Sequence, residues 1–292
     1  MPSSPGLQAP LWEPLHVGVA EEARGKNLHI YWNAPSDDTD KGGQLDLVSA
    51  YETNHYGGLI LAPIDTMASR SILLETAQDH IPVVVIDDVG APKPNRYLSY
   101  VSNDEQAGGR LAAERVARLL KGRGSIAVIG ISGGVASNTV RENAFEDAIA
   151  QIAPRIEVKM RSGDANVTRQ QQIVQAIITS PDRIDAIVAL SASATRGAFY
   201  AKIAAKPHSK LPLIGFDQTL LVPLETGDID AIIGQNTREI GRRAMRNLIA
   251  QMHGEPTPGI TLIPPILITR DNLHSPDILR LWDYQYYDWS QQ

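Results

Sequence analysis

The sequence contains no cysteine, which excludes disulfide bonds, thiolate metal ligands, cysteine nucleophiles and a lipid-modified cysteine. It also contains no uncharged apolar run that approaches the roughly 18 residues needed for a membrane-spanning helix. Residues 1–23 include neither lysine nor arginine and carry several prolines. The printed sequence therefore predicts neither a transmembrane segment nor the basic and apolar parts of an export signal.

Long blocks of like charge are also missing. The 27 lysines and arginines are outnumbered by 33 aspartates and glutamates, and the net charge is −6. This balance disfavours a protein dedicated to binding nucleic acid. With 292 residues, of which 43% are hydrophobic and 21% charged, the composition is that of a folded protein with one large or two ordinary domains.

Short β-branched and aliphatic segments alternate with longer amphipathic segments, a pattern typical of βαβ units with parallel sheets. The pattern predicts strands at 28–32, 58–62, 82–87, 97–102, 125–129, 156–160, 186–190, 213–216, 229–234 and 266–269. It predicts helices at 13–23, 44–54, 69–79, 104–120, 140–150, 168–178, 194–204 and 237–252. Several strands are apolar throughout, so helices should cover both sheet faces. Ten strands favour two α/β lobes over one sheet.

One motif matches a catalytic pattern. Residues 130–134 read Gly-Ile-Ser-Gly-Gly and follow a predicted strand, as in the nucleophile elbow of serine hydrolases. An elbow turns directly from strand to helix, whereas several residues separate Ser132 from the next helical pattern, and no suitable acid and histidine follow. A glycine-rich loop is the alternative that we favour. The seven histidines show no metal-ligand spacing, so neither a metal nor a cofactor is predicted.

Polar residues follow the predicted strands directly, at the carboxyl edge where open parallel sheets bind ligands. These residues are Asp87, Asp88, Ser191, Asp217 and Gln235, and Arg141 lies near the start of the helix that follows strand 125–129. A cation at a helix start is unfavourable unless an acceptor faces it. Each of these residues has an alternative role as a turn residue or helix cap. Together they provide the acceptors, amide and forked donor that recognition of a polyhydroxylated ligand needs.

Trp12 precedes the first predicted helix, and two roles are open for it. Its ring could stack on the apolar face of a sugar. Alternatively, it could staple the start of the helix to the core.

The chain resembles the type I periplasmic binding proteins for sugars, whose fold is shared by the effector domains of LacI-type repressors. The resemblance covers about residues 11–273 and lies in the order and spacing of several segments. These are GLILAPID at 58–65, IPVVVID at 81–87, VSND at 101–104, GGRLA at 108–112, RENAF at 141–145, IGFD at 214–217 and GQN at 234–236. Asp88 and Ser191 stand where many members have arginine and asparagine.

The resemblance implies an α/β fold of two Rossmann-like lobes with parallel sheets joined by three hinge crossings, with a sugar bound in the cleft and closure on binding. The first lobe would comprise residues 1–102 and 237–267, and the second residues 103–236 and 268–292, including a C-terminal tail. The ligand-binding residues that it implies are Trp12, Asp87, Asp88, Arg141, Ser191, Asp217 and Gln235.

The predicted function is non-catalytic binding of a small sugar or polyol for an ABC importer, with the transporter permease as partner, in the periplasm, as a monomer. The alternative is a ligand-sensing LacI-like regulatory or signalling core. A repressor needs a DNA-binding module ahead of the core, for which there is little room before Trp12. The family places a buried strand before the first helix, and residues 1–10, with three prolines, cannot supply it. We therefore expect the natural protein to begin upstream, with an export signal and an aliphatic strand.

Overall fold

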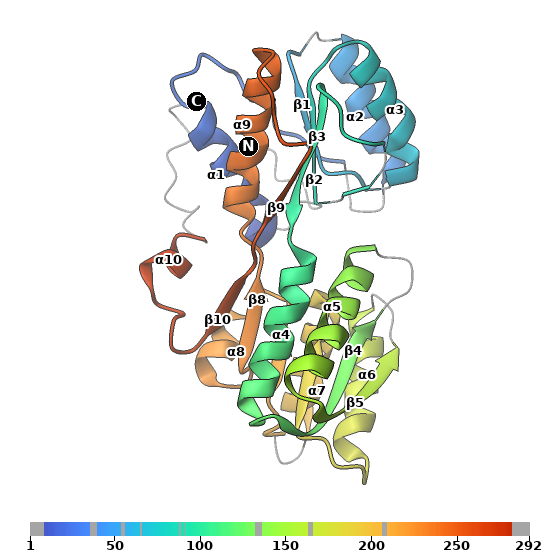
Figure 1. The fold of residues 1–292 in the computed structure, drawn as a ribbon, viewed down its shortest axis with the longest axis vertical. Helices are drawn as coiled ribbons and strands as arrows, with labels where there is room; N and C mark the ends of the chain where they lie inside the picture. Colours follow the sequence, from blue (N-terminus) through green and yellow to red (C-terminus); the bar gives the residue numbers. More distant parts are fainter. Residues whose placement is uncertain are drawn as a thin grey trace. The chain divides into compact units, whose positions relative to one another are not determined.

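The computed structural model describes residues 9–35, 40–53, 56–64, 66–87, 89–90, 92–131, 136–162, 166–205 and 209–281. The chain divides into two compact units, each built around one β-sheet (Figure 1). Unit 1 comprises Met1–Asn103, Asn236–Ile263 and Arg280–Gln292, and unit 2 comprises Asp104–Gln235 and Pro264–Leu279. The lobe boundaries expected from the sequence remain predictions.

Unit 1 contains a four-stranded parallel sheet in the order β1-β2-β3-β9. Its strands are β1 (Leu59–Leu61), β2 (Val83–Ile86), β3 (Leu98–Asn103) and β9 (Ile260–Ile263). Its longer helices are α1 (Ala9–Ala23), α2 (Lys41–Thr53), α3 (Thr66–Gln78) and α9 (Thr237–Met252). The sheet is therefore assembled from segments at both ends of the sequence.

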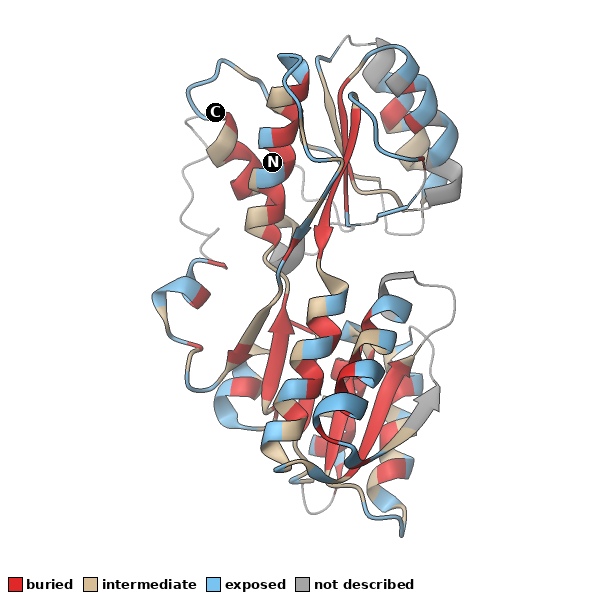
Figure 2. Ribbon diagram, in the orientation of Figure 1, coloured by how far each residue is buried: buried red, intermediate tan, exposed pale blue. Residues whose placement is uncertain are grey.

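Apolar side chains fill both faces of this sheet. Along β2, Val84 and Ile86 belong to one buried cluster with residues of α1 and α9, whereas Val83 and Val85 belong to a second cluster with Leu73 of α3. Figure 2 shows the buried strands between these helices. Helices α1 and α9 pack so closely that a Cβ at Gly241 would lie 2.1 Å from the carbonyl oxygen of Leu15. Covering of both sheet faces, expected from the wholly apolar strands, is confirmed.

Unit 2 contains a six-stranded sheet in the order β10-β8-β7-β6-β4-β5, parallel except for the antiparallel edge strand β10. Its strands are β4 (Arg123–Ile131), β5 (Arg155–Ser162), β6 (Ala186–Ala189), β7 (Leu213–Gly215), β8 (Ala231–Gly234) and β10 (Ile266–Thr269). Its helices are α4 (Glu105–Leu119), α5 (Ala136–Ile152), α6 (Val167–Thr179), α7 (Ala192–Ala204), α8 (Leu221–Thr226) and α10 (Pro276–Leu279).

The α/β fold predicted from the sequence is confirmed, but some predicted elements differ. The strand predicted at 28–32 is wrong, since this segment has no ladder partner in the described part of the chain. Strand β9 was not predicted. It is only four residues long, it is followed by two prolines, and the side chains of Ile260 and Leu262 are about half exposed. Helix α5 begins at Ala136, before the predicted start at residue 140.

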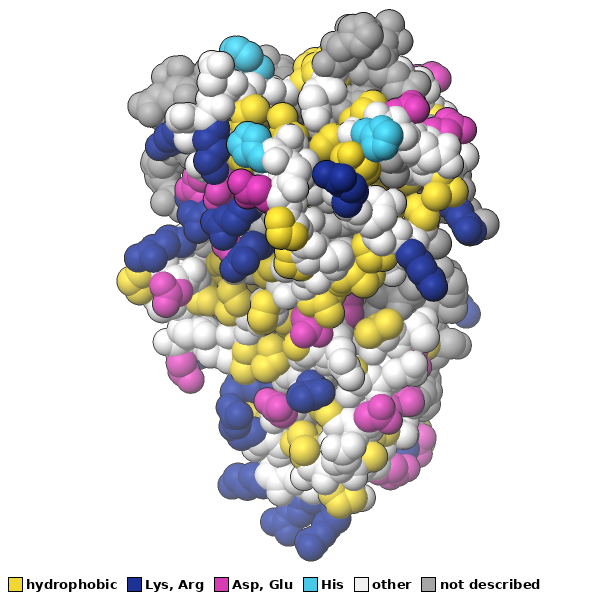
Figure 3. Space-filling model, turned by 45° about the horizontal axis from the view of Figure 1, so that its top comes forward, with side chains coloured by type: hydrophobic (Ala, Val, Ile, Leu, Met, Phe, Trp, Pro, Cys, Tyr) yellow, Lys and Arg dark blue, Asp and Glu magenta, His cyan; other side chains and the backbone are white. Residues whose placement is uncertain are grey.

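Charged side chains of both signs are intermixed on the face of the molecule in Figure 3. An ion-pair network joins α1 and α9: Glu21 binds Arg238 and Arg242, and Glu22 binds Arg246. No helix in the described ranges is long and apolar enough to cross a membrane.

Candidate functional site

Four of the seven residues selected from the sequence lie at the carboxyl edge of the unit 2 sheet. Arg141 is in α5, Ser191 follows β6, Asp217 follows β7, and Gln235 follows β8. The structure adds three side chains that contact them. We refer to the whole set as the unit 2 polar cluster: Glu105, Arg141, Ser191, Arg196, Asp217, Gln218 and Gln235.

Arg141 is buried, and its guanidinium is fixed by Glu105, the carbonyl of Leu190 and the ring of Phe216. Its Nε donates to Glu105 Oε2 at 2.7 Å, and its Nη1 donates to the carbonyl oxygen of Leu190 at 2.5 Å. The guanidinium carbon lies 4.2 Å from the ring centroid of Phe216, a cation–π contact. A planar cation fixed in this way presents its N–H groups in one orientation, which favours a directional hydrogen-bond donor over a mobile charge.

The sequence predicted that Arg141 stands at a helix start and needs an acceptor. Because α5 begins at Ala136, Arg141 lies in its second turn, where the helix dipole acts weakly. The acceptor is Glu105, the first residue of α4. The close approach of α4 to α5 requires Gly109, since a Cβ there would lie 2.1 Å from the carbonyl oxygen of Arg141. Gly109, in the motif at 108–112, thus helps to position the arginine.

Asp217 is 3% exposed and accepts several hydrogen bonds within unit 2. Its Oδ1 accepts from the backbone N–H of Thr219 at 3.0 Å and from its hydroxyl at 2.6 Å. Its Oδ2 forms an ion pair with Nε of Arg196, a half-buried residue of α7. Asp217 is therefore a fixed carboxylate whose charge is balanced by Arg196, rather than an unpaired acceptor.

Ser191 caps α7, since its Oγ accepts from the N–H of Ala194 at 3.3 Å. This is the helix-cap alternative that the sequence analysis left open. The neighbouring Thr195 hydroxyl donates to the carbonyl oxygen of Ser191 at 2.8 Å and accepts from the N–H of Phe216 at 3.0 Å. Thr195 thus ties together the ends of β6 and β7, and with them Phe216, on which Arg141 stacks.

Gln235 is anchored through its backbone. Its N–H donates to Oε1 of the buried Gln218 at 2.9 Å. The side chain of Gln235 is half-buried and keeps its amide group as a donor and acceptor at the edge of the cluster.

The candidates in unit 1 are placed separately. Asp87 directly follows β2 and has a φ of 71°. Its side chain is exposed, and its carbonyl oxygen accepts from the Ser102 hydroxyl at 2.9 Å. Trp12 lies inside α1, so the expectation that it precedes the first helix is wrong, and its side chain is half-buried against the cluster that contains Val84. Asp88 and Ser132 lie outside the described residues.

The unit 2 polar cluster contains two arginine–carboxylate pairs, Arg141–Glu105 and Arg196–Asp217. Their charges balance, so the cluster offers directional donors and acceptors without a net charge. Within the described ranges, no group of three or more histidine, aspartate or glutamate residues could hold a metal ion. The cluster offers hydrogen-bond donors and acceptors to a polar molecule.

Sequence reasoning missed Glu105, Arg196 and Gln218. Nothing in a single sequence shows that α4 packs on α5, which is what brings Glu105 next to Arg141. Arg196 lies on α7, seven residues after the end of β6, and not among the residues that directly follow the strand.

Comparison with known proteins places the chain in a family. A family model described as periplasmic binding protein domain matches residues 3–256. A D-ribose/D-allose-binding protein of Pseudomonas aeruginosa is 25% identical over 262 residues, covering 85% of this chain and 81% of that protein.

Solved structures agree in fold. A sugar-binding protein of a Bacillus halodurans sugar ABC transporter superposes with a TM-score of 0.83 at 20% identity, covering 90% of this chain and 94% of that one. An Agrobacterium vitis ABC transporter solute-binding protein, bound with α-D-tagatopyranose, gives a TM-score of 0.79 at 22% identity, covering 93% and 94%. The fold class and the non-catalytic binding function predicted from the sequence are confirmed, and the importer role is supported over the regulatory alternative. The chain belongs to the periplasmic binding protein family.

Proposed function

We propose that this protein binds a small neutral sugar or polyol through the unit 2 polar cluster and delivers it to an ABC-type importer. The observation that carries the proposal is the fixed Arg141, held by Glu105, the Leu190 carbonyl and the Phe216 ring. A guanidinium oriented before the ligand arrives loses little conformational freedom on binding, which favours affinity for a small molecule.

The charge pattern favours a neutral ligand over an acidic one. Both arginines of the cluster face carboxylates, Glu105 and Asp217, so neither cation is available as the sole partner of a phosphate or carboxylate. Sugar hydroxyls both donate and accept, and therefore match mixed donors and acceptors such as the Gln235 amide and the Ser191 hydroxyl. The P. aeruginosa relative, described as binding D-ribose and D-allose, agrees with this ligand class.

From unit 1 we propose Asp87 and the unplaced Asp88 as further polar contacts, with Trp12 as the aromatic one. The exposed Asp87 carboxylate supplies an acceptor. The Trp12 ring is only half-buried, so part of it remains available to the apolar face of a sugar.

The family and its transport relatives support an extracytoplasmic location. More specifically, we propose the periplasm, a monomeric state and a membrane permease as the partner that receives the ligand.

A thermal-shift screen over pentoses, hexoses, polyols and sugar acids tests this proposal. A ligand present at about 100 times its Kd adds roughly 2.7 kcal/mol to the free energy of unfolding, which is a shift of several degrees. We expect a neutral pentose or hexose to give the largest shift. A shift confined to the sugar acids would overturn the neutral-ligand assignment.

A further inference from the structure

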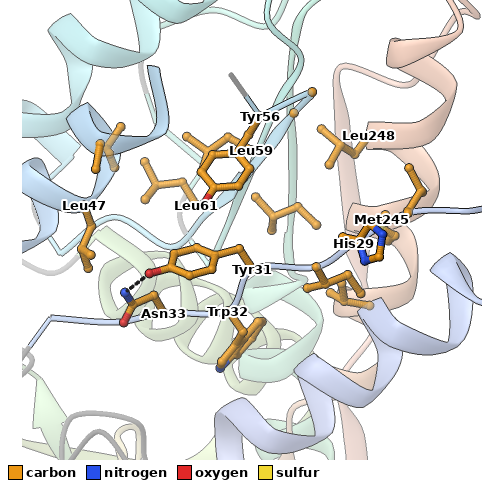
Figure 4. A pocket seen from close by; sticks show the side chains of 18 of the residues that line it. His29, Tyr31, Trp32, Asn33, Leu47, Tyr56, Leu59, Leu61, Met245 and Leu248 are labelled. Carbon is orange, nitrogen blue, oxygen red and sulfur yellow. Dashed lines mark hydrogen bonds between the residues drawn. The ribbon is translucent and has the colours of Figure 1, made fainter. Parts of the chain in front are cut away.

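Outside the residues of the proposed sugar site, the surface of unit 1 includes an uncharged groove of about 290 Å³ between the extended segment 28–33 and strand β1 (Figure 4). The rings of Tyr31 and Tyr56 stack there with centroids 5.7 Å apart. The described residues that line the groove include no lysine, arginine, aspartate or glutamate. A surface of the opposite kind, rich in exposed cations, lies in unit 2.

This second surface is the amino edge of the unit 2 sheet, where the parallel strands begin (Figure 1). Of the four adjacent strands β7, β6, β4 and β5, two begin with a basic residue and two have one three residues ahead of their first residue. Two further cations lie in the last turn of α4 and in the turn between α4 and β4. All six side chains are exposed, and we call them the basic edge: Arg118, Lys121, Arg123, Arg155, Arg183 and Lys210.

Little negative charge offsets the basic edge. Arg123 and Arg155 are direct neighbours in the ladder between β4 and β5, where like charges repel. Among the six cations, only Arg183 forms an ion pair with a described residue, Asp185 at 2.9 Å. Strands β4 and β5 contain a single carboxylate, Glu157. In a chain whose net charge is −6, this concentration of cations is unfavourable unless an anionic partner faces it.

Exposed aliphatic side chains accompany these cations. Helices α5 and α7 connect parallel strands, so they run opposite to the strands and end at the amino edge. Ile152, the last residue of α5, is 49% exposed there, and Ile203, in the last turn of α7, is 37% exposed. Binding to a membrane surface combines attraction to anionic lipids with burial of apolar side chains among the headgroups, whereas binding to a soluble polyanion depends on cations. The combination found here favours a lipid surface.

We propose that the basic edge binds the surface of an anionic phospholipid membrane. The four strand starts lie along a line of about 14 Å, since adjacent strands are about 4.8 Å apart, so the cations face several headgroups rather than one small anion. Each cation near such a surface adds to the attraction, which salt weakens. The unit 2 polar cluster lies at the opposite, carboxyl edge of the same sheet, so membrane contact does not cover those residues. The proposal is therefore independent of which sugar the protein binds.

Vesicle sedimentation tests this proposal with the 292-residue chain and without sugar. Vesicles of phosphatidylcholine with phosphatidylglycerol are compared with vesicles of phosphatidylcholine alone, at low and at high salt. We expect the protein to bind only the anionic vesicles, and only at low salt. Wild-type protein that stays in solution with anionic vesicles at low salt would overturn the proposal.

Two triple variants with the same net charge locate the binding surface. The first replaces three cations of the basic edge: Lys121→Gln, Arg123→Gln and Arg155→Gln. The control replaces three exposed cations elsewhere: Arg70→Gln, Lys93→Gln and Arg110→Gln. We expect the first variant to bind anionic vesicles at least about tenfold more weakly than the wild type, and the control to bind within about twofold of it. Equal losses would mean that net charge alone drives binding, which would contradict the proposal.

The Ile152→Ser variant distinguishes a lipid surface from a soluble polyanion. We expect it to bind anionic vesicles about threefold more weakly than the wild type, because it loses an apolar side chain that the headgroups would bury. Inorganic polyphosphate should bind the wild type much more weakly than the vesicles do. Unchanged vesicle binding by the variant, or polyphosphate binding as tight as vesicle binding, would make a soluble polyanion the partner and overturn the proposal.

Amide exchange of the unmodified chain covers variants that fail to fold. Anionic vesicles should slow exchange at residues 118–123 and 152–155, which lie on the amino edge. Slowed exchange confined to other segments would place the membrane contact elsewhere and overturn the proposal.

Discussion

Arg141 and Glu105 form a two-point ion pair in which Nε and Nη2 of the guanidinium both donate to Oε2 of the carboxylate, at 2.7 and 2.5 Å. The two residues come from different helices, α5 and α4, and the pair fixes the guanidinium against Phe216. Glu105 therefore acts as a positioning residue for Arg141.

Replacement of Glu105 by Gln tests this role. The amide keeps an acceptor oxygen near Nε but loses the charge, so we expect the guanidinium to be held less firmly and ligand affinity to fall about tenfold, or 1.4 kcal/mol. Calorimetric titration with the sugar found by the thermal-shift screen gives the number. Arg110→Ala, which removes an exposed arginine of α4, is the matched control and should bind like the wild type. An E105Q variant with unchanged affinity would remove Glu105 from the binding machinery.

Asp217 and Arg196 should contribute unequally to ligand binding. Asp217→Asn removes a buried charge that accepts from Arg196 and Thr219, and we expect it to lower both affinity and stability, the latter by about 1–3 kcal/mol. Arg196→Ala removes the half-buried partner and should weaken binding less, since the carboxylate keeps its bonds from Thr219. Paired titrations and urea unfolding distinguish the two variants. Equal losses of affinity would show that the ion pair, rather than Asp217, contacts the ligand.

Gly109 should tolerate no side chain. In Gly109→Ala the new Cβ would lie 2.1 Å from the carbonyl oxygen of Arg141, so α4 and α5 must separate. Overpacking of this kind costs about 1–3 kcal/mol, and the shift should also displace Arg141 and reduce affinity. Urea unfolding and titration on the same sample measure both effects. Wild-type values for both would show that the two helices are not held at this distance in solution.

His16 should make the protein sensitive to mild acid. Its ring stacks on Trp32 with centroids 4.1 Å apart, and burial lowers its pKa from 6.5 to about 4. Between these pH values the unfolded chain binds a proton that the folded chain excludes, so the free energy of unfolding decreases as the pH falls from 6.5 to 4. Over this pH range the free energy of unfolding decreases by about 2–3 kcal/mol.

His16→Phe keeps an aromatic ring next to Trp32 and removes the titrating group. Denaturant unfolding of both proteins between pH 4 and 7 should show a shallower pH dependence for the variant. Parallel curves for the two proteins would show that His16 is not the group responsible.

The sequence predicted most strands and helices because their patterns are local. The apolar run at 82–86 and the amphipathic helix after Asp104 are visible in a window of a few residues. The prediction at 28–32 was correct in side-chain alternation and wrong in ladder formation, because a strand also needs a hydrogen-bonded neighbour, which a local pattern does not reveal.

The candidate site shows the same division. Asp217, Ser191 and Gln235 could be selected because the ends of parallel strands meet at one sheet edge. The sequence could not show which of the candidate side chains form ion pairs within the protein. The partnership of Arg196 with Asp217 depends on the position of α7 beside β7, and that of Glu105 with Arg141 depends on the packing of α4 on α5.

Titration of Arg141→Ala is the most direct test of the proposed binding site. With the neutral sugar that gives the largest thermal shift, isothermal calorimetry should show binding to the wild-type chain and a loss of about 2–5 kcal/mol in the variant, or about 30-fold to several thousand-fold. Arg110→Ala should bind normally. If Arg141→Ala and Asp217→Ala both bind the sugar within a few-fold of the wild type, the unit 2 polar cluster is not the ligand site.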